Sequence, residues 1–129
     1  MTQPTLLIVD DEMGVRESLK IVFSKDFRIL EADSVKVAVQ KTQEERPEIV
    51  FLDILMPETD GFQALRQIKE INPHCQVIML TALNTKRTVL TAKESGAFDY
   101  VVKPFDIGDL QLKVERALRK VTEKAGGTG

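Results

Sequence analysis

Five polar side chains of this 129-residue sequence stand directly after a short apolar segment or one residue beyond it. They are Asp10, Asp11, Asp53, Thr81 and Lys103. An aspartate carboxylate can act as a nucleophile, a lysine ammonium attracts phosphate oxygens, and a threonine hydroxyl can donate a hydrogen bond to one of them. Three carboxylates close together raise each other's pKa, and a hard divalent cation such as Mg²⁺ relieves this repulsion while leaving coordination positions open for phosphate. If the fold brings these groups together, they form a site suited to metal-assisted phosphoryl transfer.

The segments before these residues have the composition of strands in a parallel sheet. The run from Ile49 to Leu52 is unbroken in its apolar character, ends in Asp53, and is followed by a turn that closes at Gly61. Such a run is typical of a strand that is covered on both faces. The expected strands are, in chain order, Thr5–Val9, Arg28–Ala32, Ile49–Asp53, Gln76–Thr81 and Asp99–Lys103.

Between the strands the apolar residues recur with the period of a helix. The expected helices begin at Met13, after a cap at Asp33 or Ser34, after Gly61, after a cap at Asn84 or Thr85, and at about Asp106, the last one running to about Val121. Five strands that alternate with five helices predict an α/β fold, a doubly wound parallel sheet with helices on both faces. The carboxyl ends of its strands share one edge, where open sheets of this kind bind ligands, so the five polar residues should meet there.

Composition limits the other classes of function. The length predicts one domain over residues 1–121, with residues 122–129 as a flexible tail or linker stub because they contain three glycines and no apolar anchor. A net charge of −2 gives no general attraction to nucleic acid or to an anionic membrane, and we expect neither as a direct partner. A single cysteine excludes an internal disulfide and fits the reducing cytoplasm, and no apolar run approaches a membrane span.

Each polar residue alone also has a structural explanation. Asp53 could cap a turn, the acidic pair could cap a helix, Thr81 could be structural and Lys103 could be a surface residue. The joint arrangement at the strand ends is what favours chemistry. Two other functions remain open: a Mg²⁺-dependent phosphohydrolase with an aspartate nucleophile, and a flavin-binding domain. The first tends to place Asp-x-Asp after the first strand, and the second needs a glycine- and hydroxyl-rich phosphate loop there, whereas this chain has Asp-Asp-Glu.

Four motifs make the sequence resemble a known family. They are Val-Asp-Asp-Glu (9–12), Asp-Ile-Leu-Met-Pro-Glu-Thr-Asp-Gly (53–61), Thr-Ala (81–82) and Gly-Ala-Phe-Asp-Tyr-Val-Val-Lys-Pro-Phe (96–105). Over about Thr5 to Val121 the chain resembles the receiver domain of response regulators in two-component signalling. Its last two elements are also similar to receivers of enhancer-binding transcriptional activators.

The resemblance implies a role for each motif residue. Asp53 would accept a phosphoryl group from a histidine of a sensor kinase and become a 4-aspartylphosphate. Asp11 and Asp53 would ligate Mg²⁺ directly together with the backbone carbonyl of Leu55, while Asp10 would hold the ion through water. Lys103 would contact one phosphoryl oxygen.

The resemblance also implies a switch. Thr81 would bond a second phosphoryl oxygen, Tyr100 would be the switch aromatic, and the bond from Lys103 to Pro104 would be cis. The fold would be flavodoxin-like, a (βα)5 sheet of strand order 2-1-3-4-5. The surface of helix 4, strand 5 and helix 5 would then control an output partner, an output domain or a homodimer.

Two further positions complete the expectations. Leu55 and Leu83 occupy variable positions beside the site, and neither can orient a hydrolytic water, so self-dephosphorylation should be slow. Leu112 should lie on the outer side of the last helix near Arg116 and Arg119, where it is a candidate partner contact.

Overall fold

The computed structural model describes residues 3–56, 60–82 and 85–125 of the chain. The strands are β1 (Thr5–Val9), β2 (Arg28–Ala32), β3 (Ile49–Asp53), β4 (Gln76–Thr81) and β5 (Asp99–Val102). The helices are α1 (Met13–Phe23), α2 (Val35–Glu45), α3 (Gly61–Ile71), α4 (Lys86–Glu94) and α5 (Ile107–Ala125). The alternation of strands and helices predicted from the sequence is therefore confirmed.

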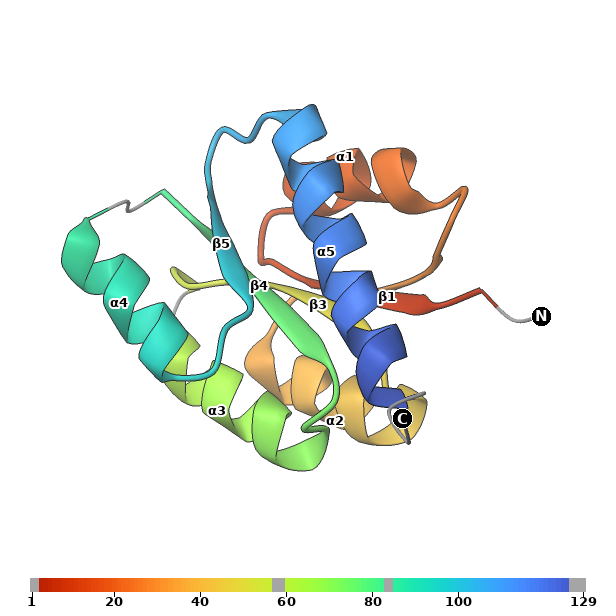
Figure 1. Ribbon diagram of the computed structural model, residues 1–129. Coiled ribbons are helices and arrows are strands. Elements are labelled where there is room, and N and C mark those ends of the chain that lie inside the picture. The colour runs from red at the N-terminus through yellow and green to blue at the C-terminus, as the bar shows by residue number, and fades with distance from the viewer. Residues whose placement is uncertain (1–2, 57–59, 83–84, 126–129) are drawn as a thin grey trace.

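The five strands form one parallel sheet in the order β2-β1-β3-β4-β5 (Figure 1). The predicted doubly wound, flavodoxin-like order is thus confirmed. After β1 the chain forms β2 on one side of it and then crosses over to form β3 on its other side. The direction of strand order therefore reverses between the adjacent strands β1 and β3. In sheets of this topology, ligands bind at the carboxyl ends of the strands where the order reverses, which are β1 and β3 here.

The central strands are buried on both faces. Alternate residues of β1, β3 and β4 point to opposite sides, so the sheet divides the apolar core into two clusters. One cluster packs under α2, α3 and α4, and the other packs under α1 and α5 (Figure 1). Burial on both faces explains why these strands read as continuous apolar runs rather than as alternating patterns.

The helix boundaries have local causes. The Ser34 hydroxyl accepts a hydrogen bond from the Val37 amide, Asp60 accepts from the amides of Phe62 and Gln63, and Thr85 caps α4. Of the alternative caps, Ser34 is therefore the one used before α2, while Asn84 lies outside the described residues.

The last helix differs from its expected bounds. It runs to Ala125, four residues beyond the predicted end at Val121. Residues 122–125 are Thr-Glu-Lys-Ala, which contain no helix breaker and continue the regular backbone hydrogen bonding although they add no apolar anchor. Helix therefore occupies the first half of the stretch that was expected to be a tail; residues 126–129 lie outside the described part.

Gly61 is required by a close approach of two backbone segments. A Cβ at this position would lie 2.7 Å from both the Cα and the carbonyl oxygen of Ile54, which follows the end of β3. Gly61→Ala should therefore lower the free energy of unfolding by about 1–3 kcal/mol, because backbone must shift to admit the methyl group. Urea denaturation measures the change.

Gly14 in α1 is the matched control, because a Cβ there meets nothing within 4 Å. Gly14→Ala should raise the free energy of unfolding by about 0.5–1 kcal/mol, since alanine loses less backbone freedom than glycine in a helix. Equal effects of the two substitutions would contradict the steric explanation.

Candidate functional site

An acidic cluster lies at the carboxyl edge of the sheet. It consists of Asp10, Asp11 and Glu12 after β1 and of Asp53 at the end of β3, and one carboxylate oxygen from each lies within 4.8 Å of the others. Asp10 is fully buried and Asp53 is 3% exposed, whereas Asp11 and Glu12 are exposed. The three predicted aspartates are thus brought together. Glu12 was missed, although its place directly after the acidic pair was the signal that could have included it.

Lys103 joins the two buried carboxylates. Its ammonium donates hydrogen bonds to Asp10 Oδ2 at 2.8 Å and to Asp53 Oδ2 at 3.3 Å, and it lies 3.6 Å from Glu12 Oε1. The Lys103 amide donates to the Thr81 carbonyl at 2.7 Å, and the peptide bond to Pro104 is cis, as predicted. The lysine thereby reaches the cluster from the end of β5, two strands away from β3.

Asp53 is a buried carboxylate with a fixed orientation. Its Oδ1 accepts a hydrogen bond from the Leu55 amide at 3.0 Å, so Oδ2 is the oxygen that faces Lys103. Burial raises the pKa of Asp53, and the nearby Asp10 charge raises it further, against the lowering effects of the Leu55 amide and of Lys103. Burial thus disfavours the Asp53 anion, and a cation bound at the site would stabilise it.

The charge of Lys103 is also set by this cluster. Burial alone would lower its pKa, but the hydrogen bonds and the attraction to Asp10 and Asp53 outweigh burial and raise the pKa above its ordinary value. Lys103 therefore keeps its positive charge at neutral pH.

Four carboxylates face one ammonium in this cluster, so negative charge remains in excess. Carboxylate oxygens are the donors that hard divalent cations prefer, and a site with few protein ligands leaves room for water or phosphate oxygens. The residues present therefore fit the hard cation that the sequence predicts.

Thr81 and Tyr100 lie on neighbouring strands beside the cluster. Thr81 ends β4, is 1% exposed, and pairs with Val102 in the register of β4 and β5. Tyr100 lies two residues earlier on β5, is half-buried, and packs against the core cluster under α2, α3 and α4. Lys113 donates to the Tyr100 carbonyl at 2.8 Å and lies 5.3 Å from the centre of its ring. Leu83, the second apolar position expected beside the site, lies outside the described residues.

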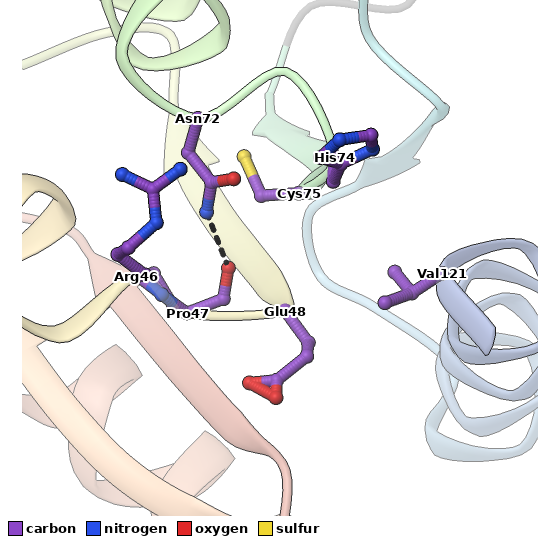
Figure 2. Close-up of a pocket in the computed structure, with 7 residues that line it drawn as sticks. All are labelled: Arg46, Pro47, Glu48, Asn72, His74, Cys75 and Val121. Carbon is purple, nitrogen blue, oxygen red and sulfur yellow. Dashed lines mark hydrogen bonds between the residues drawn. The ribbon is translucent and has the colours of Figure 1, made fainter. Parts of the chain in front are cut away.

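A separate hollow of about 380 Å³ lies at the opposite edge of the sheet (Figure 2). It is bordered by the segments that lead into β3 and β4, and the Asn72 side-chain amide donates to the Pro47 carbonyl across it at 3.1 Å. His74 at its border is exposed, and the Cys75 thiol beside it is buried. None of the predicted site residues reaches this hollow, so we assign the chemistry to the acidic edge.

Comparison with known proteins agrees with the geometry. A family described as the response regulator receiver domain matches residues 6–115. The chain belongs to this family. Membership of the receiver domain family indicates a signalling role rather than a metabolic enzyme, so it disfavours both the phosphohydrolase and the flavin-binding alternatives. None of the described helices is both long and apolar enough to cross a bilayer.

Two relatives differ in how much of their length the receiver domain occupies. The chain is 43% identical over 116 residues to the chemotaxis protein CheY of Listeria monocytogenes, covering 88% of this chain and 98% of CheY. It is 40% identical over 115 residues to the regulatory protein AtoC of Escherichia coli, covering 88% of this chain but only 25% of AtoC. The activated DrrB receiver domain from Thermotoga maritima, with bound BeF3, superimposes with a TM-score of 0.85 at 30% identity and covers 92% of this chain and 99% of that one.

The raised pKa of Asp53 predicts how the stability of this receiver depends on pH. Because the folded-state pKa lies above the unfolded value, ionised Asp53 destabilises the folded protein at neutral pH, and this penalty disappears as the pH falls through the raised pKa. Without divalent cations, Asp53→Asn should therefore raise the free energy of unfolding at neutral pH, and the gain should shrink in acid. Urea denaturation in EDTA at a series of pH values tests this. A gain in the free energy of unfolding that is independent of pH would contradict the raised pKa of Asp53.

Proposed function

We propose that this chain is a phosphorylation-switched receiver in which Asp53 is the nucleophile. The observation that carries the proposal is the Asp53 carboxylate, which is buried at a strand end, 3.3 Å from the Lys103 ammonium and within 4.8 Å of three other carboxylates. The expected donor is a phosphorylated histidine of a sensor kinase, and the expected compartment is the cytoplasm.

The proposed reaction moves a phosphoryl group from a histidine nitrogen of the kinase to Asp53. The bond between phosphorus and the histidine nitrogen breaks, its electron pair stays on the nitrogen, and a carboxylate oxygen of Asp53 forms the new bond to phosphorus. Lys103 then faces a phosphoryl oxygen as a counter-charge, with Thr81 as the donor to a second oxygen. The product is an aspartyl phosphate on Asp53.

The metal in this proposal is Mg²⁺. Asp11, Asp53 and the Leu55 carbonyl would hold it directly and Asp10 would hold it through water. Its two positive charges would neutralise the excess of carboxylates and orient the incoming phosphate. Leu55 is 51% exposed beside Asp53 and has no side-chain group that orients a water, which supports slow self-dephosphorylation.

The output surface in this proposal is formed by α4, β5 and α5. β5 is one of the two edge strands of the sheet, so among the described residues the main-chain groups on its outer side have no neighbouring strand. We expect Thr81 to move toward the phosphoryl group and the Tyr100 ring to take a new position, which is a local charge event that biases a two-state element. Leu90 on α4 and Leu112 on α5, respectively 57% and 41% exposed, provide apolar contacts for a partner.

Three kinds of partner fit this surface. CheY is matched over nearly its whole length, whereas AtoC extends far beyond the matched region. A separate partner protein, an output domain in the same chain and a second copy of the receiver are therefore all compatible with the surface.

Asp53→Asn should abolish labelling of the protein by acetyl phosphate in the presence of Mg²⁺, because the amide is not a nucleophile. Intact-mass spectrometry measures the added phosphoryl group. Asp60→Asn is the matched control: Asp60 is exposed and caps α3, and asparagine caps a helix equally well. Labelling of Asp53→Asn to the level of the control would overturn the proposal.

Leu112→Asp should weaken phosphorylation-dependent association by roughly tenfold or more, since it places a charge in an apolar contact, while labelling of Asp53 stays unchanged. Sedimentation equilibrium with and without beryllofluoride measures self-association. Ile21→Asp on α1 is the control, because Ile21 is an exposed aliphatic residue outside this surface, with 78% of it accessible. An identical mass with and without beryllofluoride, and equal partner affinity, would remove this surface from the mechanism.

A further inference from the structure

Arg16 links α1 to the main chain of the acidic cluster. Its Nη1 donates to the backbone carbonyl of Asp10 at 2.8 Å, and its Nε donates to Glu31 Oε1 on β2 at 3.1 Å. The Arg16 side chain is only 16% exposed. Arginine is rarely buried to this extent without partners, and the rigid fork of the guanidinium makes both contacts in one orientation.

The carbonyl that Arg16 holds belongs to the peptide between Asp10 and Asp11. β1 ends at Val9, so this carbonyl lies beyond the strand ladder, although the Asp10 amide still donates to the Ala32 carbonyl at 3.1 Å. A buried carbonyl needs a donor, and Arg16 supplies it. The two peptides that flank Asp10 are thereby each held from one side: the preceding one by β2 through the Asp10 amide, and the Asp10–Asp11 peptide by α1 through the Asp10 carbonyl.

The direction of Asp11 depends on this peptide. Asp11 is exposed, and among the described residues no hydrogen bond or ion pair holds its carboxylate. Asp10 differs, because its carboxylate is held by the Glu12 amide at 2.9 Å and by Lys103 at 2.8 Å. Rotation of the Asp10–Asp11 peptide would therefore turn Asp11 away from Asp53 while Asp10 stays in place.

We infer that Arg16 is a positioning residue for the cation site, which sets the direction of Asp11 by fixing the Asp10 carbonyl, with Glu31 holding the guanidinium in place. This inference rests on the proposed function, since it gives Asp11 a part in binding Mg²⁺. Groups that orient metal ligands typically change affinity by roughly 10- to 100-fold when they are removed.

Electrostatics alone predicts the opposite sign. Arg16 carries a positive charge near the cluster, so its removal would tighten the binding of a cation if charge were its only effect. A purely structural role, in which Arg16 only joins α1 to β2, predicts a loss of stability with no change in Mg²⁺ affinity. The three explanations therefore differ in the direction of one measured quantity.

Arg28 provides a matched control at the other end of the same strands. It donates to the Thr5 hydroxyl at the start of β1 and to Glu45 at 2.8 Å, so Arg28→Ala also removes an arginine that bridges two elements next to β1. The change in net charge is the same in Arg16→Ala and Arg28→Ala, but of these two arginines only Arg16 contacts a residue of the acidic cluster.

The experiment is a Mg²⁺ titration of the full chain followed by amide NMR shifts, since the sequence contains no tryptophan to report binding. Arg16→Ala should bind Mg²⁺ at least roughly tenfold more weakly than Arg28→Ala. Arg16→Lys and Glu31→Gln should show smaller losses, because each keeps one part of the contact.

Labelling by acetyl phosphate at saturating Mg²⁺ should be largely restored in Arg16→Ala, since the nucleophile is intact. Urea denaturation of each variant identifies the folded ones, and Arg16→Lys and Glu31→Gln test the inference if Arg16→Ala does not fold.

The outcomes separate the two proposals. Wild-type protein that neither binds Mg²⁺ nor becomes labelled would overturn the proposed function and this inference with it. Wild-type protein that does both, alongside Arg16 variants whose Mg²⁺ affinity equals or exceeds that of Arg28→Ala, would overturn the role of Arg16 alone.

Discussion

The ammonium of Lys103 between the buried carboxylates of Asp10 and Asp53 is the interaction on which the site depends. Parallel strands deliver both carboxylates to one edge of the sheet, where burial excludes the water that would otherwise stabilise their charges. A single cation from the end of β5 contacts both of them. Removing one partner from such a buried set leaves uncompensated charge, so β1, β3 and β5 are tied together electrostatically as well as through the sheet.

This arrangement favours function over stability. The raised pKa of Asp53 shows that the folded protein holds its anion at a free-energy cost, which one lysine does not remove. A second cation would offset the remaining charge, and a phosphoryl group would replace one carboxylate by a more highly charged group. The site is therefore sensitive to the arrival of either, and this sensitivity is what a charge-driven switch requires.

Much of the architecture could be predicted because the central strands are buried on both faces and read as unbroken apolar runs. The meeting of Asp10, Asp53 and Lys103 followed from parallel geometry, whereas the cis bond at Pro104 and the switch roles expected of Thr81 and Tyr100 came only from the resemblance to a family. The bridge from Arg16 to Asp10 and Glu31 could not be predicted, because it depends on how α1 docks and on one side-chain rotamer. The end of α5 was misplaced because residues 122–125 were assessed by their lack of apolar contacts, while a helix already formed can extend through residues of adequate propensity.

Asp10 is held by two cations that act on different atoms. Lys103 binds its carboxylate and Arg16 binds its main-chain carbonyl. In the proposed reaction the phosphoryl group on Asp53 competes with the Asp10 carboxylate for Lys103, so the contact between Lys103 and Asp10 can weaken. The contact between Arg16 and the Asp10 carbonyl is not affected by this competition. Residues 10–12 would then stay bound to α1 and β2 through the main chain of Asp10, while Lys103 moves with the end of β5. In the proposed mechanism, such a division between a fixed half and a mobile half would direct the structural response toward β5, α4 and α5 rather than toward the expected metal ligands. The two cations would thus have separate tasks, because Lys103 contacts the Asp10 carboxylate and Arg16 contacts its main-chain carbonyl.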